Sequence, residues 1–433
     1  MERQLYTSRF TAILTMLGVS VGLGNVWRFP YMMGSYGGSA FLVVYLVFTL
    51  LFAIPALMAE MTLGRMSGRG TLDAFRLSFG RKAGGFLGYM LLVVITISGS
   101  YYAVVVSNVF FTALYSLLYG FDTNSISNYN RHLNHGWFQY SITVMVIATS
   151  LYIIHKGLTR GIEYFSKLVM PVFFLALTYM IIHALLLPDA ISKFQQFLLP
   201  DLSLLGASEI FAAMGQAFFS VGLGGTFVIV YSGYFKSSEN IPVVASLTGL
   251  GDASASFMFS LFLVPSVLVF GLDLAAGPKL IFFTLPQLFM TMPGGRWVGS
   301  LFLLFIFTVA FLSLMAAYQV PFTTVQQERP SINKKKILLV IGLLQCSLAL
   351  PSSLFPDIIA VLDLVFGSGM QVLGSALCIL GLTWGAGKAK TIQHMFQSPA
   401  ISSFTSILYV WIKWIIPLAL LVVLLGYIYG VVN

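Results

Sequence analysis

The chain has 433 residues, of which 58% are hydrophobic and only 9% are charged. Soluble globular proteins carry roughly 25% charged residues, so this composition excludes a water-soluble enzyme, and the high apolar content excludes a disordered chain. The net charge of +9 must therefore be tested first as an orientation signal at a membrane. Two cysteines exclude a disulfide scaffold and a cysteine-rich metal site.

Long apolar segments recur along the whole chain. A helix that spans a membrane needs about 20 mostly apolar residues. Eleven segments meet this description, which predicts an all-α integral membrane protein. Because the apolar runs are long and do not alternate, a transmembrane β-barrel is excluded. The predicted spans are roughly 11–37, 40–63, 86–119, 138–155, 161–187, 208–235, 240–272, 297–327, 336–350, 355–385 and 402–430.

Positive charges gather on one side of this predicted topology. With the N-terminus in the cytoplasm, 18 of the 23 Lys and Arg residues fall on the inner side. The five on the outer side are Arg28, Arg131, Lys193, Lys279 and Arg296. This excess follows the positive-inside rule, so we expect a multi-pass protein of the plasma (inner) membrane with a cytoplasmic N-terminus and no nucleic-acid partner.

The run Ser-Val-Gly-Leu-Gly occurs twice, at 20–24 in the first span and at 220–224 in the sixth. In lipid, an unwound backbone persists only where it lines a cavity. Glycine-interrupted helices at matching places in two halves indicate a transporter site between inverted repeats. The alternative is close helix packing through small residues. We expect a 5+5 inverted repeat with broken first and sixth helices: residues 1–187, then 188–385, followed by a cytoplasmic linker and the eleventh span at 386–433.

Four ionisable residues fall inside the spans or at their rims: Arg28, Glu60, Asp252 and Asp363. An uncompensated charge in mid-membrane costs roughly 2.5–3.5 kcal/mol. We therefore expect Arg28 to pair with Asp363, Glu60 to accept hydrogen bonds from a broken helix, and Asp252 to face a cation. Oxygen ligands favour a hard cation such as sodium. For each residue, the alternative is a structural hydrogen bond.

At residues 18–30 the sequence GVSVGLGNVWRFP resembles the neurotransmitter:sodium symporter family. The number of spans is similar to that of bacterial members. The resemblance implies a sodium-coupled secondary active symporter that imports an amino acid by alternating access, and not an enzyme. Nearly the whole chain matches in order, through GGSAF (37–41), AEMTLGR (59–65), SGSYYAV (98–104), GIEYFSKLVMP (161–171) and GQAFFSVGLG (215–224).

The same resemblance implies two sodium sites. The first would use the Ser20 carbonyl, Asn25, Ser220, Asp252 and the substrate carboxylate. The second would use the carbonyls of Gly18, Val21 and Ala310 and the hydroxyl of Ser313.

The resemblance also implies a substrate lid and two gates. Tyr102 would hydrogen-bond the substrate carboxylate, and Phe219 would cover the substrate. Gly161 and Pro171 match the spacing at which the fifth span unwinds to let water reach the second sodium. The outer gate would be Arg28 and Asp363, and the inner gate Arg3, Tyr234 and Glu328.

Three departures from the family pattern affect these expectations. Asp252 stands where the family usually has Asn, and we predict that its charge makes chloride unnecessary. Leu314 replaces the second hydroxyl of the second sodium site, and Gly225 and Tyr318 alter the side-chain pocket. The side chains that would still suit a chloride ion are Tyr45, Gln216, Ser220 and Ser256.

Gly22 leaves no acid where the family's amine transporters have an aspartate, so the ligand should bring its own carboxylate. That carboxylate would meet the N–H groups of Leu23 and Gly24 at a half-helix N-terminus, where the helix dipole favours anions. The substrate ammonium would face the carbonyls of Ser20, Phe219 and Ser220. Small residues at 98, 222 and 225 (Ser98, Gly222 and Gly225) leave room for a large hydrophobic or aromatic side chain, and Tyr318 takes part of that room back.

Two alternatives stay open at this point. Leu314 and the protonatable Asp252 are compatible with a proton-coupled or uncoupled amino-acid transporter on the same scaffold. A sensor that binds an amino acid without moving it across the membrane would use the same pocket.

Overall fold

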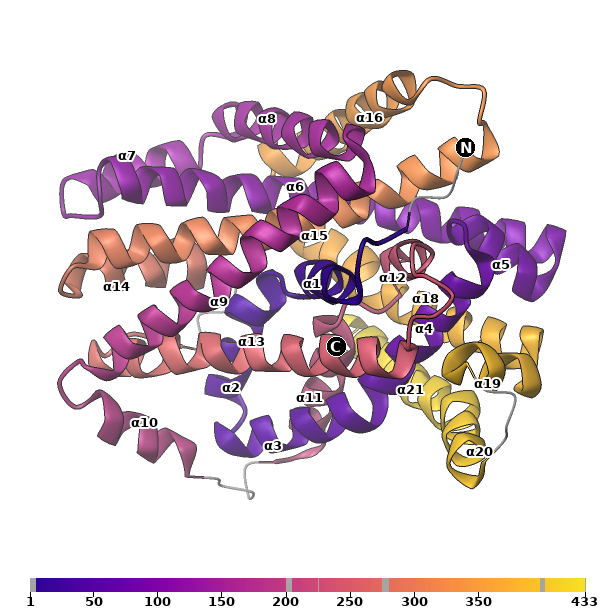
Figure 1. The fold of residues 1–433 in the computed structure, drawn as a ribbon. Helices are drawn as coiled ribbons and strands as arrows, with labels where there is room; N and C mark the ends of the chain where they lie inside the picture. Colours follow the sequence, from indigo (N-terminus) through magenta and orange to yellow (C-terminus); the bar gives the residue numbers. More distant parts are fainter. Residues whose placement is uncertain (1–4, 200–204, 225, 275–279, 398–401, 433) are drawn as a thin grey trace.

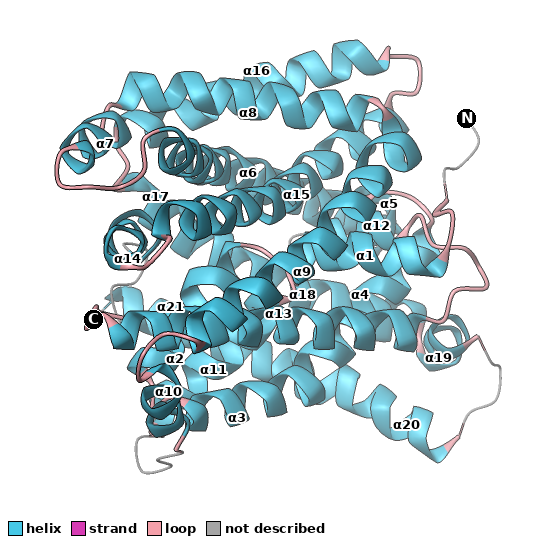
Figure 2. Ribbon diagram, turned by 60° about the vertical axis from the view of Figure 1, so that its left-hand side comes forward, coloured by secondary structure: helices cyan, strands magenta, loops and turns pink. Residues whose placement is uncertain are grey.

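The computed structural model describes residues 5–199, 205–224, 226–274, 280–397 and 402–432. Within these ranges the chain forms helices and connecting loops without a strand, as expected (Figure 2). The long helices run across the view of Figure 1, with short helices α7, α10 and α14 at one end and α5, α19 and α20 at the other.

The first five predicted spans all correspond to helical segments, in which η marks a π-helical stretch. They are α1 (Arg9–Ser20), η1 (Gly24–Arg28) and α2 (Phe29–Ser35); α3 (Ser39–Phe48), η2 (Thr49–Ala53) and α4 (Ile54–Ser67); α6 (Arg81–Leu118); α8 (Gly136–His155); and η3 (Leu158–Glu163) with α9 (Tyr164–Leu185).

The remaining six predicted spans are also helical. They are α11 (Ala207–Ser220) and α12 (Phe227–Ser232); α13 (Ile241–Val269); α15 (Gly295–Glu328); α16 (Lys334–Leu354); α17 (Ile358–Leu362), η6 (Asp363–Gly369), α18 (Met370–Leu380) and η7 (Gly381–Ala386); and α20 (Ser403–Val410), η8 (Trp411–Ile415) and α21 (Ile416–Val432). Short helices join them: α5 (Thr71–Phe79), α7 (Ser125–Leu133), α10 (Ala190–Leu198), η5 (Leu280–Thr284), α14 (Leu285–Thr291) and α19 (Lys388–Phe396).

Length and apolarity support a multi-pass membrane protein. Among the described residues, nine helices are long and apolar enough to cross a membrane, and the bent pair of the first span makes a tenth. The sixth predicted span consists of α11 and α12, each too short to span alone.

The first and sixth helices are broken, as the glycine runs predict. The two pieces of the first span meet at an angle of 62°. Between α11 and α12, Gly222 and Gly224 adopt φ values of +70° and +77°. Glycine adopts this left-handed conformation without a steric penalty, so these positions end a regular helix. Thr226 also has a positive φ, of 64°.

Glu60 stabilises the break in the sixth helix. The side chain is fully buried on α4, and its Oε1 accepts a hydrogen bond of 2.9 Å from the N–H of Gly224. An unpaired backbone N–H in a water-free interior costs several kcal/mol, so a buried acceptor at this point is required. The expected role of Glu60 at a broken helix is confirmed.

Glycine brings α4 into direct backbone contact with α12. A Cβ added at Gly64 would lie 2.0 Å from the Ser232 Oγ and 2.3 Å from the Ile229 carbonyl oxygen. Small residues at helix interfaces allow this close approach. The inner half of the broken sixth span therefore packs tightly on the second span.

We expect Gly64→Ala to destabilise the protein by at least the ~1–3 kcal/mol typical of overpacking, because the backbone of α12 must move. The measurement is the thermal midpoint of the purified protein in detergent. The matched control is Gly85→Ala on α6, where the nearest atom to the added Cβ is the Arg76 Nε at 3.9 Å. Equal midpoints for the two variants would contradict the proposed backbone contact.

Candidate functional site

The two broken helices meet at their unwound residues. The Ser20 hydroxyl lies 3.5 Å from the Val221 carbonyl, and the Asn25 amide donates to the Ser220 Oγ at 3.0 Å. Both polar side chains are buried. The two Ser-Val-Gly-Leu-Gly runs are therefore brought together in the middle of the fold.

Asn25 lies at the centre of a buried cluster of oxygen atoms. Its Nδ2 faces the Asp252 Oδ1 at 2.8 Å, the Asp252 carbonyl at 3.3 Å, the Ser256 Oγ at 2.9 Å and the Ser220 Oγ at 3.0 Å. Its Oδ1 accepts from the Gly22 N–H at 2.8 Å. A side-chain amide has two protons and cannot serve four acceptors. This surplus of oxygen atoms is the arrangement that suits a hard cation.

The Asp252 carboxylate is fully buried within this cluster. Its Oδ2 accepts a hydrogen bond of 2.5 Å from the Ser220 hydroxyl, and its Oδ1 accepts from Asn25. The structure thus places the three side chains expected at the first sodium site in mutual contact. Near them, the buried Tyr45 hydroxyl and the Gln216 Oε1 have no hydrogen-bond partner among the described residues.

Ser313 on α15 faces the end of α1. Its Oγ lies 3.1 Å from the Val19 carbonyl, 3.3 Å from the Val21 carbonyl and 3.4 Å from the Val309 carbonyl. One hydroxyl proton can serve only one of these oxygens at a time. Carbonyls at a helix C-terminus carry partial negative charge, which also favours a cation. Two of the groups expected at the second sodium, Val21 and Ser313, are therefore close together.

The other two ligands expected at the second sodium are Gly18 and Ala310. Ala310 is fully buried on α15, as is Leu314, which stands where the family has the second hydroxyl. A Cβ at Gly18 would lie 2.9 Å from the Leu312 Cδ1 and 3.6 Å from the Ser166 Oγ. Ser166 is a buried hydroxyl on α9 without a hydrogen-bond partner in the described part of the chain, and it was not among the expected site residues. The only sequence signal for it is its place in the GIEYFS run that opens the fifth span.

Gly22 lies between Tyr102 of α6 and Ser313 of α15. A Cβ added there would lie 3.2 Å from the Ser313 Oγ, 3.5 Å from the Tyr102 hydroxyl and 3.9 Å from the Ser20 carbonyl. The Tyr102 hydroxyl is within reach of the Leu23 N–H and the Ser313 hydroxyl. The groups expected to receive a substrate carboxylate therefore converge on one point.

Phe219 covers this point from the side of α11. A Cβ at Gly24 would lie 2.8 Å from the Phe219 Cε1. The Arg28 guanidinium lies over the same ring, 4.4 Å from its centroid. The aromatic lid and the cation expected at the outer gate are thus in direct contact.

Asp363, the expected partner of Arg28, is held by a residue that was not among the expected gate residues. Its Oδ1 accepts a hydrogen bond of 3.1 Å from the Tyr101 hydroxyl. Arg28 attracts the same carboxylate electrostatically. Tyr101 directly precedes Tyr102, so one turn of α6 contacts both Asp363 and the residues around Gly22.

The far end of the pocket differs in detail from expectation. Tyr318 is fully buried, and its hydroxyl donates to the Gly99 carbonyl, next to Ser98, at 3.3 Å. A Cβ at Gly222 would lie 2.6 Å from the Phe227 Cε2, so the Phe227 ring occupies space beside this glycine. Phe227 was not among the expected pocket residues. Gly225 lies outside the described residues.

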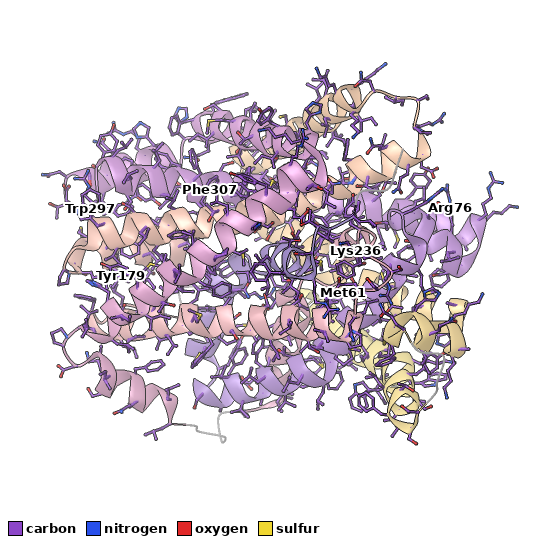
Figure 3. All side chains as sticks on the ribbon, in the orientation of Figure 1. Met61, Arg76, Tyr179, Lys236, Trp297 and Phe307 are labelled. Atoms are coloured by element: carbon purple, nitrogen blue, oxygen red, sulfur yellow. The ribbon has the colours of Figure 1, made fainter. Side chains whose placement is uncertain are left out.

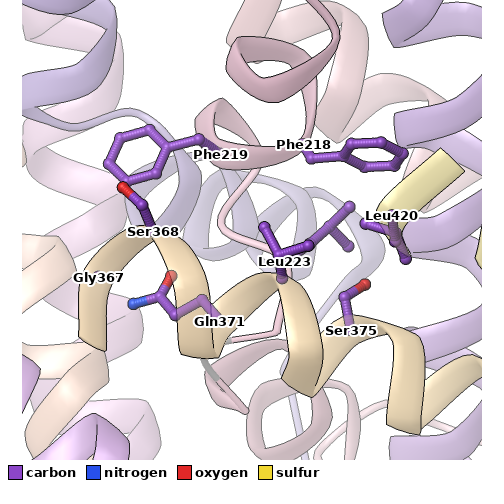
Figure 4. A pocket seen from close by; sticks show the side chains of 9 residues that line it. Phe218, Phe219, Leu223, Gly367, Ser368, Gln371, Ser375 and Leu420 are labelled. Atoms are coloured by element: carbon purple, nitrogen blue, oxygen red, sulfur yellow. The ribbon is translucent and has the colours of Figure 1, made fainter. Parts of the chain in front are cut away.

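A small hollow lies behind the lid, between α11, α18 and α21 (Figure 4). The unwound part of the sixth span contacts α18 there through backbone alone, since a Cβ at Gly224 would lie 1.6 Å from the Gln371 carbonyl oxygen. The residues that line the hollow are Phe218, Phe219, Leu223, Gly367, Ser368, Gln371, Val372, Ser375 and Leu420.

Glu328, which was expected at the inner gate, pairs with a residue that was not expected there. Its two carboxylate oxygens accept hydrogen bonds of 2.6 Å and 3.2 Å from Arg76 of α5, which lies at the end of the molecule shown on the right of Figure 3. This interaction raises the pKa of the Arg76 guanidinium. Tyr234 contacts the Thr323 hydroxyl at 3.1 Å. Arg3 lies outside the described residues.

On this side, the segment before α1 contacts the start of the fifth span and the loop between α12 and α13. The Thr7 N–H donates to the Glu163 Oε1 at 3.1 Å, and the Lys236 Nζ donates to the Thr7 carbonyl at 2.9 Å. Gly161, expected where the fifth span unwinds, lies in η3, and Pro171 lies inside α9. The start of the fifth span is therefore helical, and Glu163 joins it to the segment before α1.

Comparison with known proteins identifies the family of the chain. The sequence matches the model of the Sodium:neurotransmitter symporter family over residues 3–132 and 121–432. Uncharacterized sodium-dependent transporters of Haemophilus influenzae and Bacillus subtilis are each 27% identical to the chain. Both alignments cover 98% of this chain; they cover 98% of the Haemophilus influenzae protein and 97% of the Bacillus subtilis protein.

A solved structure has the same fold. The crystal structure of MhsT in complex with L-phenylalanine superposes with a TM-score of 0.87 and 27% sequence identity, and the match covers 98% of this chain and 100% of MhsT. The family match extends over nearly the whole sequence, and the fold match includes both broken helices. The chain belongs to the sodium:neurotransmitter symporter family.

Proposed function

We propose that this protein is a sodium-coupled symporter that imports a large hydrophobic or aromatic amino acid by alternating access. The observation that carries the proposal is the point where Gly22, Tyr102 and Ser313 converge beside the Asn25–Asp252 cluster. A substrate carboxylate would be stabilised there, since the Tyr102 hydroxyl and a half-helix N-terminus both favour an anion. The complex of MhsT with L-phenylalanine supports an aromatic substrate.

Sodium would bind next to the carboxylate. In this proposal Asn25, Ser220 and Asp252 contribute side-chain oxygens, and the Ser20 carbonyl and the substrate carboxylate complete the first site. A second ion would lie between Val21 and Ser313, with carbonyls of Gly18 and Ala310. Because Leu314 is apolar, we propose that this second ion is held mainly by carbonyl oxygens.

The substrate ammonium would face the negative ends of α1 and α11. Carbonyls at the C-terminal end of a helix carry partial negative charge. Ser20 ends α1, and Phe219 and Ser220 end α11. The substrate zwitterion would therefore lie along the dipoles of the half-helices, with its two charges at opposite helix ends.

Binding would shift the transporter between its states. A ligand changes a conformational equilibrium only by its differential affinity for the two states. Sodium and carboxylate would both contact residues of the two broken helices, so together they would order the unwound segments. Closure of Phe219 over the substrate would carry Arg28 towards Asp363 and close the outer gate. Loss of the contacts of Tyr234 and Glu328 would open the inner gate, of which Arg3 would be the third member.

We expect purified protein in proteoliposomes to accumulate radiolabelled phenylalanine or leucine in response to an inward sodium gradient. Unlabelled leucine, phenylalanine and tryptophan should compete, whereas glycine and alanine should not. Replacement of sodium by lithium should reduce uptake, because we propose that the spacing of the oxygen ligands suits sodium. Uptake that follows a pH gradient without sodium would favour a proton-coupled transporter, and saturable binding without accumulation would favour a sensor.

We expect Tyr102→Phe to weaken substrate binding about 10- to 100-fold, because a hydrogen bond to a charged group contributes roughly 1.5–3 kcal/mol. The measurement is the competition constant in a scintillation proximity assay at saturating sodium. The matched control is Tyr115→Phe on the same helix, whose hydroxyl donates to the Ser125 carbonyl at 2.8 Å, away from the site. If substrate affinity fell equally in both variants, the result would contradict a hydrogen bond between Tyr102 and the substrate.

Replacement of chloride by gluconate should leave the uptake rate of the unmodified protein unchanged, because Asp252 supplies the negative charge beside the sodium. In Asp252→Asn the sodium affinity should fall and chloride should stimulate uptake, with Tyr45, Gln216, Ser220 and Ser256 around the anion. The measurement is the sodium dependence of uptake with and without chloride. Chloride dependence that is present in the unmodified protein and lost in Asp252→Asn would contradict this assignment.

A further inference from the structure

Lys413 stands in a cage of aromatic rings on the last span. Its Nζ lies 4.3 Å from the ring centroid of Trp384, 5.5 Å from that of Trp414 and 5.9 Å from that of Tyr409. Trp384 belongs to η7 at the end of the tenth span, and the other residues belong to α20 and η8. The cage therefore joins the last two spans.

This cage faces outwards from the helix bundle. Trp384 and Trp414 are each 54% exposed, and Ile407 and Leu418 on the same span are also exposed. In a membrane-spanning protein, exposed apolar and aromatic side chains of a span face lipid. Lys413 thus presents a positive charge at a lipid-facing surface.

The charge of Lys413 is incompletely compensated by the described part of the protein. Within that part, its ammonium makes no ion pair with a carboxylate within 4.0 Å and no hydrogen bond. Aromatic faces attract a cation but leave the three N–H donors of the ammonium unused. The indole N–H groups of Trp384 and Trp414 also donate to no described residue, whereas the Trp411 N–H donates to the Leu51 carbonyl.

The cage lies near a boundary between membrane and water. Trp384 is in the last turn of the tenth span, just before α19, which carries Lys388 and Lys390. Trp and Tyr side chains gather at the level of the lipid headgroups. Figures 1 and 2 show α19 and α20 together at the end of the molecule where α5 also lies.

We propose that Lys413, Trp384, Tyr409 and Trp414 form a binding site for the headgroup of an anionic phospholipid. Charge complementarity favours this occupant over a second protein chain, because the surface presents cations and indole N–H donors among apolar groups. Lys388 and Lys390 add positive potential on the same side, and basic pockets between spans recognise anionic headgroups.

The test is a titration of delipidated protein in detergent, followed by native mass spectrometry, with phosphatidylglycerol and phosphatidylcholine of identical acyl chains. We expect phosphatidylglycerol to bind the unmodified protein more tightly, and Lys413→Gln to weaken that binding about tenfold without affecting phosphatidylcholine. Lys413→Arg should retain it. The matched control is Lys156→Gln, since Lys156 contacts a single ring, that of Tyr152, at 4.7 Å.

Substrate binding and the thermal midpoint of each variant establish that it is folded. Equal affinity for the two lipids, or unchanged phosphatidylglycerol binding in Lys413→Gln, would overturn the proposal. So would a dimer of the unmodified protein in lipid-free detergent that dissociates in Lys413→Gln, since the surface would then bind a second copy. These readouts do not depend on sodium coupling or on the identity of the transported amino acid.

Discussion

The polar groups at the two helix breaks depend on one constraint: unwound backbone in an apolar interior must still form hydrogen bonds. Where α1 and α11 end, N–H and C=O groups lose their helical partners and have no bulk water to replace them. Glu60 accepts from Gly224, and Asn25 accepts from Gly22, so two of these donors are satisfied by side chains. The carbonyl oxygens opposite Ser313 share one proton. The helix breaks therefore contain more hydrogen-bond acceptors than donors, and this excess of oxygen atoms favours the cations of the proposed mechanism.

Asp252 shows how a charge is tolerated at such a centre. Its two carboxylate oxygens accept from different helices, one from Asn25 of the first span and one from Ser220 of the sixth. A buried carboxylate with hydrogen bonds to both broken helices links their positions. In the proposed function, the ion that binds there would strengthen the link, and its departure would weaken it. The same residue would therefore govern both ion binding and the relative placement of the two repeats.

The sequence predicts the spans and the two breaks because both follow from local physical chemistry. Long apolar runs must be helical in lipid, and the paired glycines at 222 and 224 take the left-handed conformation that ends α11. Partners across the fold were harder to predict. The pairing of Glu328 with Arg76, the ring of Phe227 beside Gly222, and the cage around Lys413 join residues that periodicity places on helix faces without specifying the neighbouring helix. Such contacts depend on the global arrangement of helices, which no local pattern contains.

The contact of Gly224 with the Gln371 carbonyl has a mechanical consequence. At this contact no side chain separates the two backbones, so no change of side-chain rotamer can accommodate sliding of one helix along the other. The sixth span at its break and the tenth span must either move as one rigid piece or separate altogether. Since Asp363 precedes Gln371 on the same span, a rigid movement would carry this residue of the proposed outer gate together with the unwound segment of the sixth span. Closing one side and rearranging the proposed ion site would then be a single event.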